Sequence, residues 1–203
     1  MKKILLSLLC AVFAIGASAQ RAGSSSFFST EKAENPVVFG LRGGMNISTM
    51  AGDINVSSKI GFNAGLNVDF SIVESFGVQT GLLFTTKGWK EDDVKANPMY
   101  LEIPILASYR YHFTDNLRWE FNFGPYFAYG VGGNYSYDGD SYGDVFGDNG
   151  YKRFDAGLAL GTGVTISKFY VGLQYEFGLA NIVDSDHYSV KNSNFSIGVG
   201  YNF

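Results

Sequence analysis

The chain contains almost no cysteine, little proline and little charge. Its 203 residues include one cysteine, Cys10, and four prolines, and Asp, Glu, Lys and Arg together make up 17% of the sequence. Cys10 lies in an N-terminal apolar run that we expect to be cleaved off, so the mature chain should have neither disulfides nor cysteine-based metal sites. This low charge and the scarcity of proline are unusual for a soluble domain.

The N-terminal 19 residues have the features of a secretory signal peptide. Residues 2–3 are lysines, 4–16 form an apolar run, and 17–19 form a small-residue cleavage site. The run is too short for a membrane-spanning helix, which needs roughly 20 apolar residues, and no later segment reaches that length. We therefore expect a signal peptide over 1–19, with cleavage between Ala19 and Gln20.

The mature chain is acidic, which argues against nucleic acid as a partner. Of 15 basic residues, the two leader lysines are lost, so 13 basic residues face 19 acidic ones and the net charge is −6. Glycine is abundant (26 residues) and aromatic residues make up 16%. An aromatic excess combined with many alternating segments is typical of transmembrane β-barrels.

Residues 60–70, IGFNAGLNVDF, alternate strictly between apolar and small or polar side chains. This period of two predicts a strand with one apolar and one polar face, and it recurs in seven other segments. The predicted strands are 36–48, 59–72, 76–88, 99–112, 117–132, 152–166, 169–181 and 194–203. Residues 20–35 are expected to form a flexible N-terminal extension, which leaves 36–203 as the barrel domain.

The lengths of the connections indicate a membrane barrel. Those after the first, third, fifth and seventh strands are long and polar, and the others are short. Outer-membrane barrels have short periplasmic turns and longer extracellular loops. The predicted strands also reach the roughly 9–11 residues needed to cross a bilayer.

The distribution of charge predicts which face points inward. None of the apolar faces carries Lys, Arg, Asp or Glu, and on a lipid-facing surface a mid-bilayer Arg or Lys would cost about 2–4 kcal/mol. The polar faces carry five basic and five acidic residues that could pair as an interior network: Arg42, Asp69, Lys87, Glu102, Arg110, Arg118, Glu120, Arg153, Asp155 and Glu176. We therefore predict an all-β, eight-stranded antiparallel up-and-down transmembrane β-barrel in which Asp69 pairs with an Arg or Lys. The aromatic residues near strand ends are expected in interfacial girdles: Trp89, Tyr100, Tyr109, Tyr111, Trp119 and Tyr129.

Several segments together resemble a known family. They are FGLRGGMNIS, KIGFNAGLNVDF, GVQTGLLFTTKGW, YLEIPILASYRY, FNFGPYFAYGVGG and FDAGLALGTGV. The chain resembles, over 36–203, the small outer-membrane β-barrel family of Bacteroidetes (porin-family or PorT-type), and the segment at 100–111 is the most specific. The resemblance implies an eight-stranded barrel like the OmpA transmembrane domain, with no substrate or reaction. The terminal YNF, with Tyr201 and Phe203, is similar to the C-terminal signal read by the barrel assembly machinery.

The residues that could carry chemistry are few. The histidines are His112, expected as an interfacial residue, and His187, whose HYS context has the His-x-Ser spacing of lipid A deacylases. Ser189 and an aspartate at 184 or 186 could complete such a triad. The acidic residues of the loop at 138–150 could attract Ca²⁺, but they do not follow the EF-hand spacing. We expect a solvated loop, no catalysis, and no cofactor or metal.

The sequence therefore predicts an outer-membrane protein with a structural or surface-interaction role. The expected partners are outer-membrane lipid and lipopolysaccharide, the barrel assembly machinery, and an unknown protein or surface ligand that binds the extracellular loops. A small-solute or ion channel is the first alternative. A soluble lipocalin-like binding barrel and a lipid A deacylase-like enzyme are the others.

Overall fold

The structure, a computed structural model, describes residues 28–52, 56–146, 150–184 and 188–203. The signal peptide predicted at 1–19 lies outside these ranges. Ten strands occur in the described part: β1 (Val37–Gly52), β2 (Ser57–Val73), β3 (Phe76–Thr86), β4 (Trp89–Glu91), β5 (Val94–Thr114), β6 (Leu117–Tyr137), β7 (Asp140–Asp144), β8 (Phe154–Ile166), β9 (Phe169–Gly178) and β10 (Val190–Asn202). None of the described residues belongs to a helix of the length and apolarity that a bilayer crossing needs.

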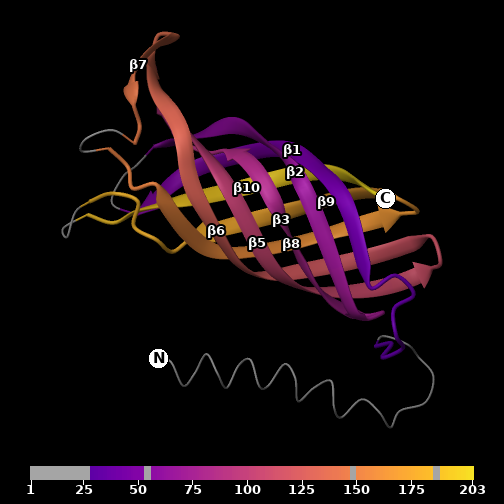
Figure 1. Cartoon of the computed structure of the whole chain (residues 1–203). Coiled ribbons are helices and arrows are strands. Elements are labelled where there is room, and N and C mark those ends of the chain that lie inside the picture. Colours follow the sequence, from indigo (N-terminus) through magenta and orange to yellow (C-terminus); the bar gives the residue numbers. More distant parts are fainter. Residues whose placement is uncertain (1–27, 53–55, 147–149, 185–187) are drawn as a thin grey trace, which may run out of the picture.

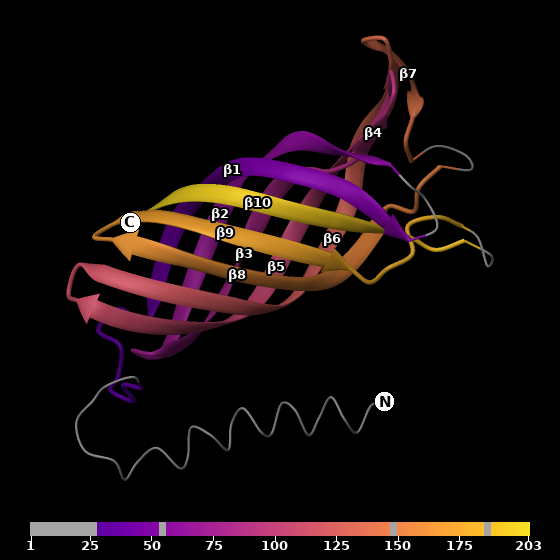
Figure 2. The ribbon, with the colours of Figure 1, turned by 180° about the vertical axis from the view of Figure 1, so that it is seen from behind.

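Eight of these strands close into a barrel (Figures 1 and 2). Each pairs antiparallel with the next in the order β1, β2, β3, β5, β6, β8, β9, β10, and β10 pairs back to β1. This order confirms the predicted eight-stranded up-and-down barrel. The short strand β4 continues the line of β3, since it pairs with both β2 and β5, and β7 lies outside the ring beside β6. Neither strand was predicted.

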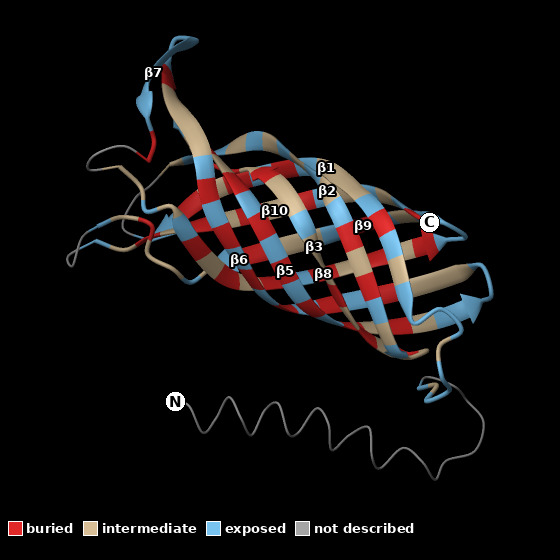
Figure 3. Cartoon of the chain, viewed as in Figure 1, coloured by how far each residue is buried: buried red, intermediate tan, exposed pale blue. Residues whose placement is uncertain are grey.

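The barrel has an apolar exterior and a polar interior. Phe62, Leu66 and Phe70 of β2 are exposed, whereas Asn67 and Asp69 between them are buried. The same alternation gives every strand of the ring a checkered burial pattern (Figure 3). The lipocalin-like alternative is therefore wrong, because such a barrel would need its apolar side chains inside.

The two ends of the barrel differ. At one end, here called the turn end, two-residue turns at 74–75, 115–116 and 167–168 join neighbouring strands. At the opposite end, the loop end, the longer connections join the remaining strands. The alternation of short and long connections predicted from the sequence is therefore present.

The strands β5 and β6 continue beyond the ring at the loop end and form a hairpin (Figures 1 and 2). β4 pairs with β5 on one side of it, and β7 pairs with β6 on the other. We call residues 89–97 and 134–144 the hairpin extension. The sequence predicted polar loops here, because most residues of these segments are polar, although Ala96 is buried and Trp89 and Tyr135 pack against the cluster around it.

Part of the predicted flexible extension is attached to the turn end. The amide of Ser29 donates to Ser75 Oγ at 2.8 Å, and the Ser29 hydroxyl donates to Glu74 Oε2 at 2.7 Å. The Phe28 ring stacks on Phe76 with 5.8 Å between centroids. Residues 28–36 therefore form a segment that lies against the barrel.

Candidate functional site

The charged interior of the barrel is the candidate site. Nine of the ten charged residues predicted to line the interior do so, in two clusters. The Lys87 cluster lies toward the loop end and the Arg110 cluster toward the turn end. The members of the Lys87 cluster are Lys87, Glu102, Asp155 and Glu176, and those of the Arg110 cluster are Arg42, Asp69, Arg110, Arg118 and Glu120.

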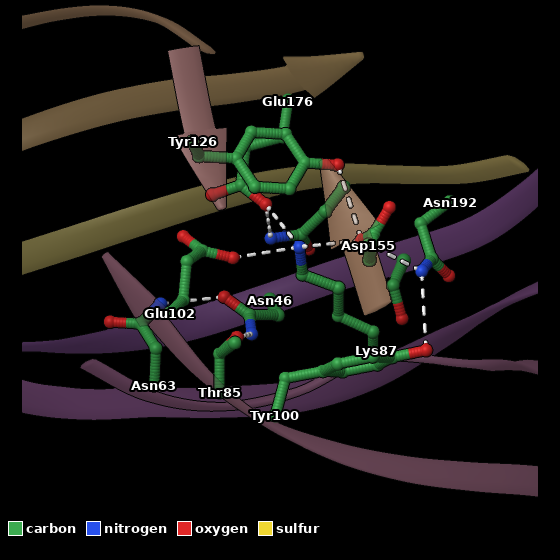
Figure 4. A network of polar contacts seen from close by, with 12 residues as sticks. Asn46, Asn63, Thr85, Lys87, Tyr100, Glu102, Tyr126, Asp155, Glu176 and Asn192 are labelled. Carbon is green, nitrogen blue, oxygen red and sulfur yellow. Dashed lines mark hydrogen bonds and ion pairs between the residues drawn. The ribbon is translucent and has the colours of Figure 1, made fainter. Parts of the chain in front are cut away.

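The Lys87 cluster places one ammonium among three carboxylates (Figure 4). Lys87 follows β3, and its fully buried Nζ lies 2.8 Å from Glu102 Oε2 on β5 and 2.9 Å from Glu176 Oε2 on β9. Asp155 Oδ2 on β8 lies 3.7 Å away. A single cation therefore links three strands, and removing it would leave buried carboxylates without their counter-charge.

Aromatic and amide side chains enclose this cluster (Figure 4). The Lys87 ammonium lies 4.3 Å from the centroid of the Tyr126 ring, and the Tyr126 hydroxyl donates to Asp155 Oδ2 at 3.3 Å. Asn192 Nδ2 donates to the same oxygen at 2.9 Å and to the Tyr100 hydroxyl at 3.4 Å. Tyr100 and Tyr126 are fully buried, so they fill much of the lumen at this level.

The Arg110 cluster is built on Asp69, as the sequence predicted. The Arg110 guanidinium donates to Asp69 Oδ1 and, through Nη1, to Ser71 Oγ at 2.7 Å. Arg118 Nη2 donates to Glu120 Oε2 at 3.3 Å and lies 3.8 Å from Asp69 Oδ2. The Asp69 carboxylate therefore lies between two guanidinium groups, and the Glu120 carboxylate pairs with Arg118.

Arg42 completes the interior set from β1. Its guanidinium carbon lies 4.2 Å from the centroid of the Tyr170 ring, and Nη1 donates to Asn202 Oδ1 at 2.9 Å. Gln79 Nε2 donates to Glu120 Oε1 at 3.4 Å. The Arg110 cluster therefore contains three cations and two anions, whereas the Lys87 cluster contains one cation and three anions.

A cavity of about 70 Å³ touches both clusters. Its lining includes Arg42, Gln79 and Tyr170 on one side and Glu102 and Glu176 on the other. Since a cavity of roughly 10–15 Å³ by this measure can hold one water molecule, this cavity is large enough for water. An eight-stranded barrel has an interior just wide enough for side chains to fill. The open space inside this part of the barrel is therefore a small cavity that lies between the Lys87 cluster and the Arg110 cluster.

Arg153 does not lie in the interior network, although the sequence placed it there. It precedes β8 at the loop end, where Nη1 donates to the carbonyl of Gly130 at 2.9 Å and Nη2 lies 3.9 Å from Asp144 Oδ2. Its guanidinium carbon lies 5.1 Å from the centroid of the Phe146 ring. The alternation extends to Arg153, but β8 begins one residue later, so the side chain reaches the rim instead of the lumen.

The sequence placed Tyr100 in an interfacial aromatic girdle. In the structure its side chain is buried in the lumen, beside the Lys87 cluster. It lies on the same face of β5 as Glu102, so its position in the alternation could have revealed it. The sequence did not indicate that Asn192 faces the lumen, because the last strand was predicted to begin at 194, whereas β10 begins at Val190.

The residues considered for chemistry are not gathered into a site in the described part of the chain. His187 and Asp186 lie outside the described residues, and Asp184 is an exposed partner of Lys152 at 3.1 Å. His112 lies on β5 opposite Arg118, near the turn end. Part of the acidic loop forms β7, and no group of three His, Cys, Asp or Glu among the described residues is arranged to hold a metal ion.

A comparison with models of known protein families identifies the family of this chain. The model of the outer membrane protein beta-barrel domain matches residues 19–184. A comparison with curated proteins gives no match.

Three solved structures are similar to the chain over most of its length. Ail of Yersinia pestis is 19% identical, with 82% of this chain and 98% of that chain covered and a TM-score of 0.46. Neisserial surface protein A is 13% identical, with 81% and 97% covered and a TM-score of 0.47. OprG of Pseudomonas aeruginosa is 16% identical, with 85% and 97% covered and a TM-score of 0.43. Because the family model spans more than half of the sequence, this chain belongs to the outer membrane protein β-barrel domain family.

Proposed function

We propose that this outer-membrane protein binds a partner at the cell surface and has no catalytic role. The observation that carries the proposal is the hairpin extension, in which β4, β5, β6 and β7 pair in that order at the loop end. β4 also pairs with β2 of the ring, and the end of β6 stands out beyond the ring with β7 beside it (Figure 1). Longer loops of outer-membrane barrels face the outside of the cell. The hairpin extension would therefore be presented to the surroundings.

The outer strand of this sheet has features of a docking edge. β7 pairs with β6 on one side, and among the described residues no strand pairs with its other side. All five residues of β7 are exposed, and the Tyr142 ring stacks on Tyr135 with 6.1 Å between centroids. An open strand edge can accept an extended segment of another protein through backbone hydrogen bonds.

The tip of the hairpin extension favours a basic partner. It carries five carboxylates and two lysines, and the exposed aromatic Tyr137 lies among them. The acidic residues are Glu91, Asp92, Asp93, Asp138 and Asp140. Charge complementarity speeds encounter with a partner of opposite sign, and tyrosines are frequent centres of binding energy.

Photo-crosslinking on intact cells tests this proposal. A photo-reactive amino acid at Tyr142 should form adducts with a second protein, and the same group at Asn116 in a turn-end turn serves as the matched control. With the crosslinker at Ser141 instead, adducts should form when residue 142 is Tyr and disappear in Tyr142→Pro, because proline removes a backbone donor from this strand. Equal labelling at 142 and 116 would contradict the proposal.

A channel is the second candidate, because the lumen is polar and contains the cavity between the two clusters. We expect planar bilayers containing the purified protein to show no sustained conductance, since Lys87 and Arg110 and their partners occupy the interior. Sustained conductance in the unmodified protein would favour the channel. Deacylated lipid A that disappears with His187→Ala would favour the deacylase-like enzyme.

A further inference from the structure

Two lysines face each other directly at the loop end without a counter-charge. Lys90 of β4 is the cross-strand partner of Lys95 of β5. Like charges directly opposite each other on a sheet are destabilising. Neither lysine forms an ion pair with any described residue. We call Lys90 and Lys95 the lysine patch.

The face of β5 that carries Lys95 is the outer face of the barrel wall. Ala96 and Tyr100 are buried, so the alternate residues Lys95, Met99 and Leu101 point outward, and Leu101 is exposed. Lys95 lies four residues beyond Met99, or about 13 Å along the strand. The lysine patch therefore stands just above the apolar surface that lipid tails cover.

Both lysines of the patch point to this outer face, because Lys90 is the cross-strand partner of Lys95. Long lysine side chains can lie along apolar surface while the ammonium reaches the polar boundary. The carboxylates nearest in sequence, at 91–93, occupy the tip of the β4–β5 hairpin, farther from the apolar surface.

We infer that the lysine patch binds the phosphate groups of lipopolysaccharide in the outer leaflet. The loop end faces the cell exterior in barrels of this kind, so the patch meets the leaflet that contains this lipid. Lysine is a compact point charge that suits phosphate, and a bound phosphate would relieve the repulsion between Lys90 and Lys95. The inference does not depend on the surface partner proposed above.

Native mass spectrometry of the full-length protein in neutral detergent micelles tests this site. The lipids are bis-phosphorylated lipid A, dephosphorylated lipid A and phosphatidylglycerol, titrated in a chelator so that divalent cations cannot bridge lipid to the tip carboxylates. The test variant is Lys90→Gln/Lys95→Gln. Lys168→Gln, which removes an exposed lysine from a turn at the turn end, is the matched control. A shift in gel mobility on heating verifies that each variant is folded.

The unmodified protein and the Lys168→Gln variant should bind bis-phosphorylated lipid A equally. A lysine near an anionic lipid surface contributes about fivefold in affinity, so the double variant should bind roughly 25-fold more weakly. The unmodified protein and both variants should bind dephosphorylated lipid A with the same affinity. The inference is overturned if the double variant binds normally, if Lys168→Gln loses as much affinity, or if dephosphorylated lipid A or phosphatidylglycerol binds as tightly as bis-phosphorylated lipid A.

Discussion

The Asp69 carboxylate on β2 and the Arg110 guanidinium on β5 form a hydrogen-bonded ion pair across the intervening strand β3. Both residues are 1% exposed and lie 41 positions apart in the sequence. Since a slip of one residue in either strand would turn one of them toward lipid, the pair favours a single register. The pair therefore forms only when the alternation of the sequence turns both side chains inward and the barrel closes around them.

Replacing Asp69 should destabilise the barrel strongly. In Asp69→Ala, the buried Arg110 loses its closest counter-charge, and breaking a buried pair from one side costs about 3–5 kcal/mol. Urea titration of the protein in lipid vesicles would measure the change in the free energy of unfolding. Asp184→Ala removes the exposed carboxylate that pairs with Lys152, and this control should lose less than about 1 kcal/mol.

Removing Lys87 should destabilise the barrel through repulsion among carboxylates. Lys87→Met retains much of the side-chain volume but leaves Glu102, Asp155 and Glu176 without the cation that they share, and we expect a loss of about 3–5 kcal/mol. Adding Glu102→Gln should restore part of the stability, since one negative charge is removed. Thermal unfolding followed by gel mobility compares the two variants. A double variant no more stable than Lys87→Met would contradict this account.

The sequence predicts the ring well because one physical constraint acts on all of it. Wherever lipid covers one face and side chains fill the other, as at Leu66 and Asn67, polarity must alternate. The charges of β2, β5 and β9 could therefore be assigned to the interior before their partners were known. Which charges meet depends on strand order and stagger, and so the partition into two clusters could not be predicted.

The prediction fails where that constraint ends. Beyond the ring, lipid no longer covers one face of the hairpin extension. Ala96 belongs to a buried cluster with Val145 and Phe146, but polar residues dominate the extension, so its composition did not mark β4 or β7 as strands. Arg153 lies at the same boundary, and its place in the alternation no longer determines what it contacts. The attachment of residues 28–36 depends on contacts with the turn at 74–75, which a local pattern does not encode.

Two neighbouring glycines of β1 should respond differently to alanine. A Cβ at Gly44 would lie 2.9 Å from the Gly198 Cα, whereas at Gly43 the nearest atom would be the Asn63 carbonyl oxygen at 3.6 Å. Gly44→Ala should therefore cost about 1–3 kcal/mol, as overpacking does, and Gly43→Ala should be neutral or slightly stabilising. Urea midpoints in vesicles measure both. Equal effects would show that close approach of β1 and β10 does not limit this position.

Removing the Phe28 ring should loosen residues 28–36. Phe28 stacks on Phe76 and lies 5.6 Å from Tyr109, and such aromatic contacts contribute about 0.5–1.5 kcal/mol each. In Phe28→Ala, limited proteolysis within 28–36 should therefore be severalfold faster, with cleavage sites read by mass spectrometry. Phe113→Ala removes an exposed aromatic ring that packs on Tyr111 and should leave the cleavage rate unchanged.

The C-terminal aromatic residues allow assembly to be separated from stability. Phe203 is 65% exposed, and its amide donates to the Phe39 carbonyl at 2.9 Å, a contact that its side chain does not provide. The Phe203 ring meets Tyr201 with 5.8 Å between centroids. If Tyr201 and Phe203 serve as an assembly signal, Phe203→Ala should lower the folded fraction in the outer membrane of cells severalfold.

The same variant should refold into lipid vesicles nearly as well as the unmodified protein, because an exposed ring contributes little to the barrel's packing. Phe169→Ala is the matched control, since Phe169 is equally exposed and also contacts Tyr201, at 5.3 Å between centroids, but lies outside the C-terminal segment. Gel mobility before and after heating measures the folded fraction in both settings. A similar loss for Phe169→Ala in cells, or a loss for Phe203→Ala in vesicles, would mean that the ring supports the fold and is not read as a signal.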